Sequence, residues 1–173
     1  MKLASEIINL DVFCLEDNTV LGKVKDLVID PTNGKLVAFK IYGKGIKKDQ
    51  NLVSVLEVKH LDREVLAIES KSKIESENEL PRPYEILKSK IRILKNKVFT
   101  ESGNLVGRVS DYALDSNTSQ LSRIYVSGNG LSFFFGRERV FSFLQIVEIT
   151  KNKIIVFDKS LSIAKAAVPE IDA

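Results

Sequence analysis

Four aspartates are the most regular polar feature of this 173-residue chain, and their spacing suggests two kinds of chemistry. Asp26 and Asp30 lie four residues apart, and Asp111 and Asp115 repeat that spacing. Paired carboxylates can bind a cation or exchange protons with a substrate. In an extended strand, however, residues four apart are separated by about 13 Å, which is too far for one ion. The pattern favours a structural role, in which Asp26 accepts backbone N–H groups at a bulge and Asp30 starts a turn.

The residues that usually carry catalysis are scarce. The chain has one cysteine, Cys14, and one histidine, His60, in separate segments. A single cysteine excludes an internal disulfide and a cysteine-based zinc site, and a reactive thiol needs an activating base. Gly22 and Gly107 lack the Gly-Lys-Ser/Thr continuation of a phosphate-binding loop, so a turn or a close backbone approach explains them better. The sequence therefore predicts no catalytic, cofactor-binding or metal site, and a protein that is not an enzyme.

A run of cations could bind an anionic partner. Five of them fall within ten residues, namely Lys88, Lys90, Arg92, Lys95 and Lys97. As a solvated strand face, this run needs no further explanation. Alternatively, it binds acidic protein, lipid head groups or RNA phosphate through point charges, and such binding weakens in salt. We take Lys88, Lys90 and Arg92 as candidate partner-binding residues.

An aromatic segment at residues 128–139 is the second candidate surface. Three consecutive phenylalanines cannot all face one core in a strand, because side chains alternate between the two faces. One explanation of these phenylalanines is structural, namely packing on the rest of the chain. The other is functional, namely an aromatic anchor at an interface or a membrane surface. The candidate partner-binding residues of this segment are Phe133, Phe134, Phe135, Arg137 and Arg139.

Composition and charge describe an ordinary folded protein. Apolar residues make up 44% of the chain and charged residues 28%, which is typical of a packed globular protein. The net charge of +3 combines −2 in residues 1–80 with +5 in residues 81–173. No apolar run approaches the roughly 18 residues that span a bilayer, and Glu6 interrupts any secretory signal. We therefore expect a cytoplasmic location.

An internal repeat organises the chain. Residues 12–30 and 98–115 match in register when one residue is dropped from the second turn. The match continues downstream, where Leu36, Ser54 and Leu56 correspond to Leu121, Ser142 and Leu144. The structural residues of the repeat are Gly22, Asp26 and Asp30 in one copy and Gly107, Asp111 and Asp115 in the other. A repeat of this length predicts two copies of one small domain.

The copies are expected at residues 1–70 and 84–158. Between them, residues 71–83 are polar and end in two prolines, as a linker would, and residues 159–173 form a C-terminal tail. Tyr84 to Lys90 could form a short helical turn. Within each copy, short β-branched and aromatic runs separated by turn sequences predict five or six strands. The fold class is therefore all-β, with two small barrels in tandem, a polar linker and minor helical turns.

Each copy resembles a PRC-barrel domain, the small β-barrel of the photosynthetic reaction-centre H subunit and of a ribosome-maturation factor. The residues that carry the resemblance run from Gly22-Lys-Val-Lys-Asp26 through Asp30 to the turn at Gly34, and again from Gly107-Arg-Val-Ser-Asp111 to Asp115. The second copy departs from the pattern with Ser119 in place of the turn glycine. The resemblance to the soluble tandem type implies protein binding and no catalysis.

These observations lead to one expected function and to alternatives. The leading hypothesis is a non-catalytic adaptor or scaffold that holds a protein partner through the phenylalanine segment and the basic run. The alternatives are an RNA- or ribosome-associated accessory factor and a peripheral adaptor at a membrane surface. A homodimer also remains open, and no cofactor is expected.

Overall fold

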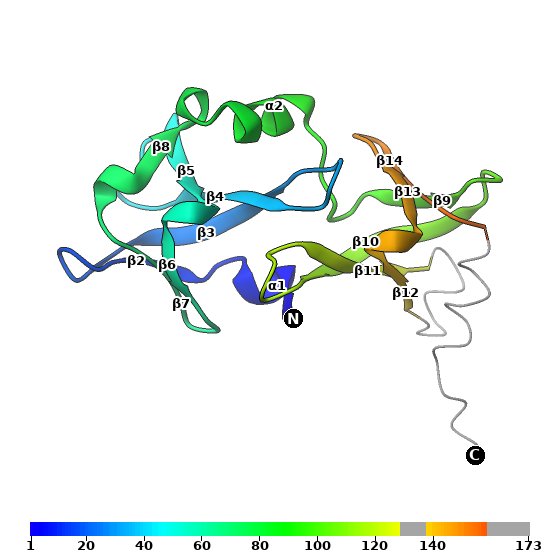
Figure 1. Ribbon diagram of the computed structural model, residues 1–173, viewed down its shortest axis with the longest axis horizontal. Coiled ribbons are helices and arrows are strands. Elements are labelled where there is room, and N and C mark those ends of the chain that lie inside the picture. The colour runs from blue at the N-terminus through cyan, green and yellow to red at the C-terminus, as the bar shows by residue number, and fades with distance from the viewer. Residues whose placement is uncertain (129–137, 159–173) are drawn as a thin grey trace, which may run out of the picture.

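The structure is a computed structural model that describes residues 1–128 and 138–158. Two curled β-sheets of seven strands each lie next to one another along the long axis of the molecule (Figure 1). The described residues contain more strand than helix, so the all-β class with minor helical elements is confirmed. Within these residues, no helix is long and apolar enough to cross a membrane.

The elements follow the repeat. The first part of the chain forms β1 (Lys2–Leu3), α1 (Ala4–Ile7), β2 (Asp11–Cys14), β3 (Thr19–Ile29), β4 (Leu36–Tyr42), β5 (Gln50–Ser54), η1 (Val55–Glu57), β6 (Val58–Leu61), β7 (Val65–Ile68), η2 (Lys71–Lys73), β8 (Ile74–Ser76) and η3 (Glu77–Glu79). The second part forms α2 (Pro81–Ser89), β9 (Lys97–Thr100), β10 (Leu105–Leu114), β11 (Leu121–Ser127), β12 (Arg139–Ser142), η4 (Phe143–Gln145), β13 (Ile146–Ile149) and β14 (Lys153–Val156).

Six strands of each sheet have the same topology, as the repeat predicts, and the seventh differs, being β8 in the first sheet and β1 in the second. In the first copy β2 pairs with β3 and runs parallel to β7, with Val12 opposite Leu66. In the second copy β9 pairs with β10 and runs parallel to β14, with Val98 opposite Ile154. The long strands β3 and β10 both change register one residue before the aspartate, between Val24 and Asp26 and at the equivalent place in β10. The phase slip in the sequence thus corresponds to a β-bulge.

The two repeated glycines lie where the backbones of neighbouring strands approach closely. A Cβ atom on Gly22 would be 2.1 Å from the carbonyl oxygen of Tyr42, and one on Gly107 would be 2.0 Å from that of Ser127. Any side chain would have to push the strands apart, so glycine is required at both positions.

Residues 71–83 are not the free linker that their composition predicts. Strand β8, within this segment, pairs with β5, and the side chain of Ile74 is buried in the core. Helix α2 follows, and its Ile86 packs with Val28 and Leu52 of the first copy. The first copy therefore extends past residue 70, and residues 84–89 pack on the first copy although they were expected to open the second. The backbone pairing of β8 covers the edge of β5, and Ile74 is the residue of β8 that is buried in the core.

The chain start crosses to the second sheet. Strand β1 pairs with β10, placing Lys2 opposite Leu114 and Leu3 opposite Ala113. The segment that looked like the beginning of the first copy thus adds a strand to the second. The sequence alone does not indicate this pairing, because a strand of two residues shows no periodicity.

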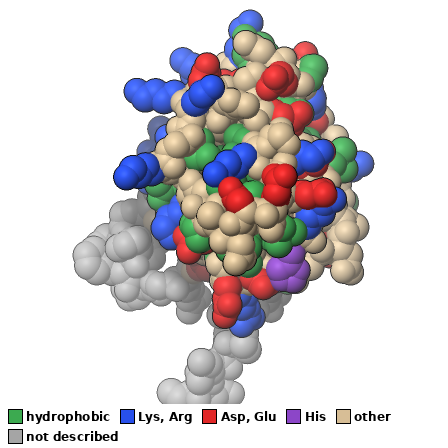
Figure 2. All heavy atoms as spheres, turned by 90° about the vertical axis from the view of Figure 1, so that its left-hand side faces the viewer, with side chains coloured by type: hydrophobic (Ala, Val, Ile, Leu, Met, Phe, Trp, Pro, Cys, Tyr) green, Lys and Arg blue, Asp and Glu red, His purple; other side chains and the backbone are tan. Residues whose placement is uncertain are grey.

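The outer end of the first copy carries alternating charges. Figure 2 shows basic (Lys or Arg) and acidic side chains interspersed over this end of the molecule. Ion pairs connect many of them, including Lys59 with Glu69 at 3.2 Å and Lys71 with Asp17 at 3.0 Å. Such exposed pairs contribute little to stability, but they give this end a polar surface.

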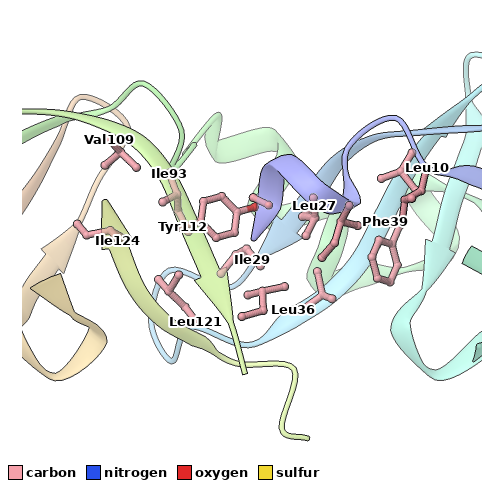
Figure 3. Close-up of a cluster of buried hydrophobic side chains, with 14 of the residues drawn as sticks. Leu10, Leu27, Ile29, Leu36, Phe39, Ile93, Val109, Tyr112, Leu121 and Ile124 are labelled. Carbon is pink, nitrogen blue, oxygen red and sulfur yellow. The ribbon is translucent and has the colours of Figure 1, made fainter. Parts of the chain in front are cut away.

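The two copies share one hydrophobic core. At their junction, Leu36 N–H donates to the carbonyl of Ser119 at 2.9 Å, and Leu121 N–H donates to that of Gly34 at 2.7 Å. Leu36 is equivalent to Leu121 in the repeat, and Gly34 is equivalent to Ser119. The two bonds are therefore related by approximate two-fold symmetry. Buried side chains continue from one sheet to the other through this junction. Figure 3 shows this for Ile29, Leu36, Tyr112 and Leu121.

Candidate functional site

The repeated aspartates occupy the structural positions that their spacing suggests. Asp26 accepts the N–H of Leu27 at 2.9 Å at the bulge in β3, and Asp111 accepts the N–H of Tyr112 at 2.8 Å. Asp30 accepts the N–H of Thr32 in the following turn. In the described part of the chain, no group of three or more potential ligands could hold a metal ion.

Asp30 also holds helix α2. Its buried carboxylate accepts hydrogen bonds from Nε and Nη2 of Arg82, each at 2.8 Å. Burial by itself would raise the pKa of Asp30, but the hydrogen bonds from Thr32 and the guanidinium of Arg82 together lower it below its ordinary value. Among the described residues, the carboxylate of the equivalent Asp115 accepts hydrogen bonds only from its own turn, at Asn117 and Thr118. This aspartate thus has an added role in the first copy.

Cys14 and His60 do not form a catalytic pair. Cys14 is completely buried in the core, whereas the imidazole of His60 is exposed and lies 2.9 Å from the carboxylate of Asp62. Backbone N–H groups of Glu64 and Val65, and then His60, lower the pKa of Asp62 to about 2. A carboxylate so stabilised is a turn anchor and a weak base.

The basic run divides between two places. Lys88 lies on helix α2 with its Nζ 5.9 Å from the centre of the Tyr84 ring, a cation–π arrangement. Lys90 ends the helix in a left-handed conformation, and Lys90 and Arg92 line a cavity between the copies. The structure therefore brings two of the three basic candidates together and leaves Lys88 outside.

Of the aromatic segment, only Arg139 lies in the described residues. It begins β12 half-buried, and its Nη1 donates to the carbonyl of Val106 at 3.4 Å. Phe133, Phe134, Phe135 and Arg137 lie outside the described residues. Their proposed anchoring role stays a prediction.

The cavity has a volume of about 590 Å³. Its walls are β3 of the first copy, helix α2 and residues 90–95, and Tyr112 of the second copy also lines it. Burial, and then the charges of Asp26 and Asp111, raise the pKa of the Tyr112 hydroxyl, so this group stays protonated. The lining of the cavity combines cations, the carboxylates of Asp26 and Glu77, and apolar side chains.

Comparison with known families assigns the fold. The family model of the PRC-barrel domain matches residues 1–73 and again residues 92–162, which together are most of the chain. The chain belongs to the PRC-barrel family. It is a tandem member, as the sequence resemblance indicated, and the residues between its two PRC-barrel matches include β8 and α2. No curated protein matches the chain closely enough to be called a relative.

The two PRC-barrel copies differ at one equivalent surface. The exposed ion pair of Lys59 and Glu69 in the first copy corresponds, by strand register, to Val147 and Phe157 in the second. These two apolar side chains are 46% and 44% exposed. We call Leu144, Val147 and Phe157 the second-copy patch.

In both PRC-barrel copies, an exposed leucine lies in the 3-10 helix that directly precedes this strand pair, β6 and β7 or β13 and β14. Leu56 in η1 and Leu144 in η4 are each 87% exposed. The residue before Leu144, Phe143, packs against the turn of the other copy at Gly34, and the residue before Leu56, Val55, lines a pocket that Ser119 also lines. The second-copy patch is not among the residues predicted from the sequence. The repeat alignment, continued to the pair Ile68 and Val156, sets Glu69 against Phe157 at the next position.

Proposed function

We propose that this protein is a non-catalytic adaptor that holds a protein partner on the second-copy patch. One observation carries the proposal, namely that exposed apolar side chains in the second copy replace an exposed ion pair in the first. The fold tolerates charge at these two positions in the first copy, so packing within the part of the chain that the structure describes does not require Val147 and Phe157 to be apolar.

The energetics favour a covered patch. Leu144 is almost fully exposed, and Val147 and Phe157 are about half exposed. Complete burial of an exposed apolar side chain contributes about 1.5–3 kcal/mol, so covering the three contributes on the order of 3–5 kcal/mol before association costs. Clustered exposed apolar residues are typical of interaction sites, whereas isolated ones are common everywhere.

The chain provides its own matched variant for the test. Val147→Lys with Phe157→Glu gives the second copy the ion pair of the first, which the same fold already accommodates. Affinity capture and cross-linking from extract of the source organism should recover a partner with the wild-type chain and lose it with this variant. Leu56→Ser, on the first copy, is the control, and we expect it to keep the partner. Equal recovery by all three proteins would contradict the proposal.

The other candidate functions give different results in related measurements. An RNA- or ribosome-associated factor would lose binding between about 50 and 200 mM salt and on substitution of Lys88, Lys90 and Arg92. A membrane-surface adaptor would float with liposomes that contain anionic lipid. We include a cytoplasmic location in the proposal, supported by the free thiol of Cys14.

A further inference from the structure

The cavity between the copies has the size and composition of a ligand site. Its volume of about 590 Å³ falls within the range of roughly 300–1,000 Å³ that is common for binding pockets. Ile86 and Leu87 of helix α2 line one side, and Ile91 and Leu94 of the following segment line another. A ligand there would bury an apolar side chain against these residues.

The charge of the cavity is positive. Lys25, Lys90, Arg92 and Lys95 line it, and none of them forms an ion pair with a carboxylate in residues 1–128 or 138–158. A fifth cation, Lys40, is neutralised by Glu77 at 2.7 Å. Asp26 is the remaining carboxylate of the lining. Several unpaired cations in a partly enclosed space favour an anionic ligand.

The second copy shows what the aspartate of this site can bind. Asp111, which is equivalent to Asp26, accepts hydrogen bonds from both the backbone N–H and the hydroxyl of Ser5 in helix α1. By the register of the repeat, the position of Ser5 is taken by Ile91 near Asp26. An isoleucine side chain cannot donate a hydrogen bond. Within the described residues, Asp26 accepts only from Leu27 N–H, so its second oxygen is open to a donor.

We propose that the cavity binds a short acidic peptide segment of a partner protein, with an N–H or hydroxyl of that segment on Asp26. The acidic side chains of the segment contact Lys25, Lys90, Arg92 and Lys95, and an apolar side chain packs on Ile91. The contact of Ser5 with Asp111 is the internal example of this mode. This inference deepens the proposed adaptor function and rests on it, but it concerns a different surface from the second-copy patch.

The probe is a phage library of random seven-residue peptides, selected on the full chain. Recovered peptides should be enriched in Asp, Glu, Ser and Thr, and a fluorescein-labelled copy of the most enriched peptide should bind in fluorescence anisotropy. Arg92→Glu with Lys95→Glu should weaken that binding at least about tenfold, and Lys25→Glu, in the β3 wall of the cavity, should weaken it too. Lys151→Glu, an exposed cation outside the cavity, is the matched control and should leave the affinity unchanged.

Several results would overturn the inference. These are failure of the library to enrich any peptide, enrichment of basic or purely apolar peptides, and unchanged affinity in both the Arg92/Lys95 and the Lys25 variants. Displacement of the peptide by an oligouridine decamer at lower concentration would also overturn it, in favour of nucleic acid. Val147→Lys with Phe157→Glu should still bind the peptide. If a partner is captured through the second-copy patch while no peptide binds, the cavity inference fails and the adaptor proposal stands.

Discussion

The guanidinium of Arg82 donates two hydrogen bonds of 2.8 Å to the buried carboxylate of Asp30. Arg82 lies in the first turn of helix α2, and Asp30 follows β3 of the first copy. This contact joins the segment between the two family matches to the first copy. Because helix α2 also forms a wall of the cavity, the same contact positions Ile86 and Leu87 there.

Loss of this contact should destabilise the protein. Arg82→Ala leaves a buried carboxylate without its guanidinium, and we expect the free energy of unfolding to fall by about 2 kcal/mol. Urea denaturation of the full chain measures the change. Lys88→Ala, an exposed cation on the same helix, should change stability by less than about 1 kcal/mol. Equal effects of the two substitutions would mean that the Asp30 contact is not stabilising.

The pH dependence of stability should contain a contribution from Asp30. Its pKa in the folded chain lies below the ordinary value of 3.8, so its stabilising effect is complete above that value and is lost as pH falls through the folded pKa. Asp30→Asn removes this contribution. The stability difference between wild type and Asp30→Asn should be constant from pH 5 to 7 and should shrink below about pH 4. A difference that grows on acidification would contradict the assigned pKa direction.

Gly107 should tolerate no side chain. A Cβ atom there would lie 2.0 Å from the carbonyl oxygen of Ser127, so Gly107→Ala must separate β10 from β11. We expect a loss of about 1–3 kcal/mol in the free energy of unfolding, measured by chemical denaturation. Leu105→Ala, at an exposed position of the same strand, should stay within about 0.5 kcal/mol. An unchanged stability for Gly107→Ala would show that the strands can move apart at little cost.

The two copies should unfold together. They share one core, exchange backbone bonds at Leu36 and Leu121, and the chain start belongs to the second sheet. Differential scanning calorimetry should show one transition, with a calorimetric enthalpy equal to the van't Hoff enthalpy. Deletion of residues 1–5 should lower the temperature of that single transition. Two resolved transitions in the wild-type chain would contradict a common core.

Much of the fold could be predicted because it is repeated. Gly22 and Gly107, and the four aspartates, recur where strand crossings, bulges and turns impose the same backbone requirement on each copy. The strands themselves show period-two alternation, which depends on one buried face. Requirements on the local backbone and on one buried strand face restrict which residue types fit, so they can be recognised in the sequence.

The shortest strands, and the contacts between residues far apart in the sequence, could not be predicted in the same way. Strand β1 has two residues, and β8 is a three-residue strand with one buried side chain, Ile74, so neither has a period. The cavity depends on how residues 90–95 pack beside β3, which is a long-range contact. The second-copy patch was visible in principle, as a difference at Lys59 and Glu69 in an extended repeat alignment, but the exposure of Val147 and Phe157 required the structure.

The central claim is that the second-copy patch binds a protein partner. The most direct test is the dissociation constant of the captured partner, measured by titration calorimetry with wild type and with Val147→Lys and Phe157→Glu combined. The account predicts binding at least about tenfold weaker for the variant, a loss of about 1.4 kcal/mol, with an unchanged unfolding midpoint. An equal dissociation constant for the two proteins, both folded, would contradict it.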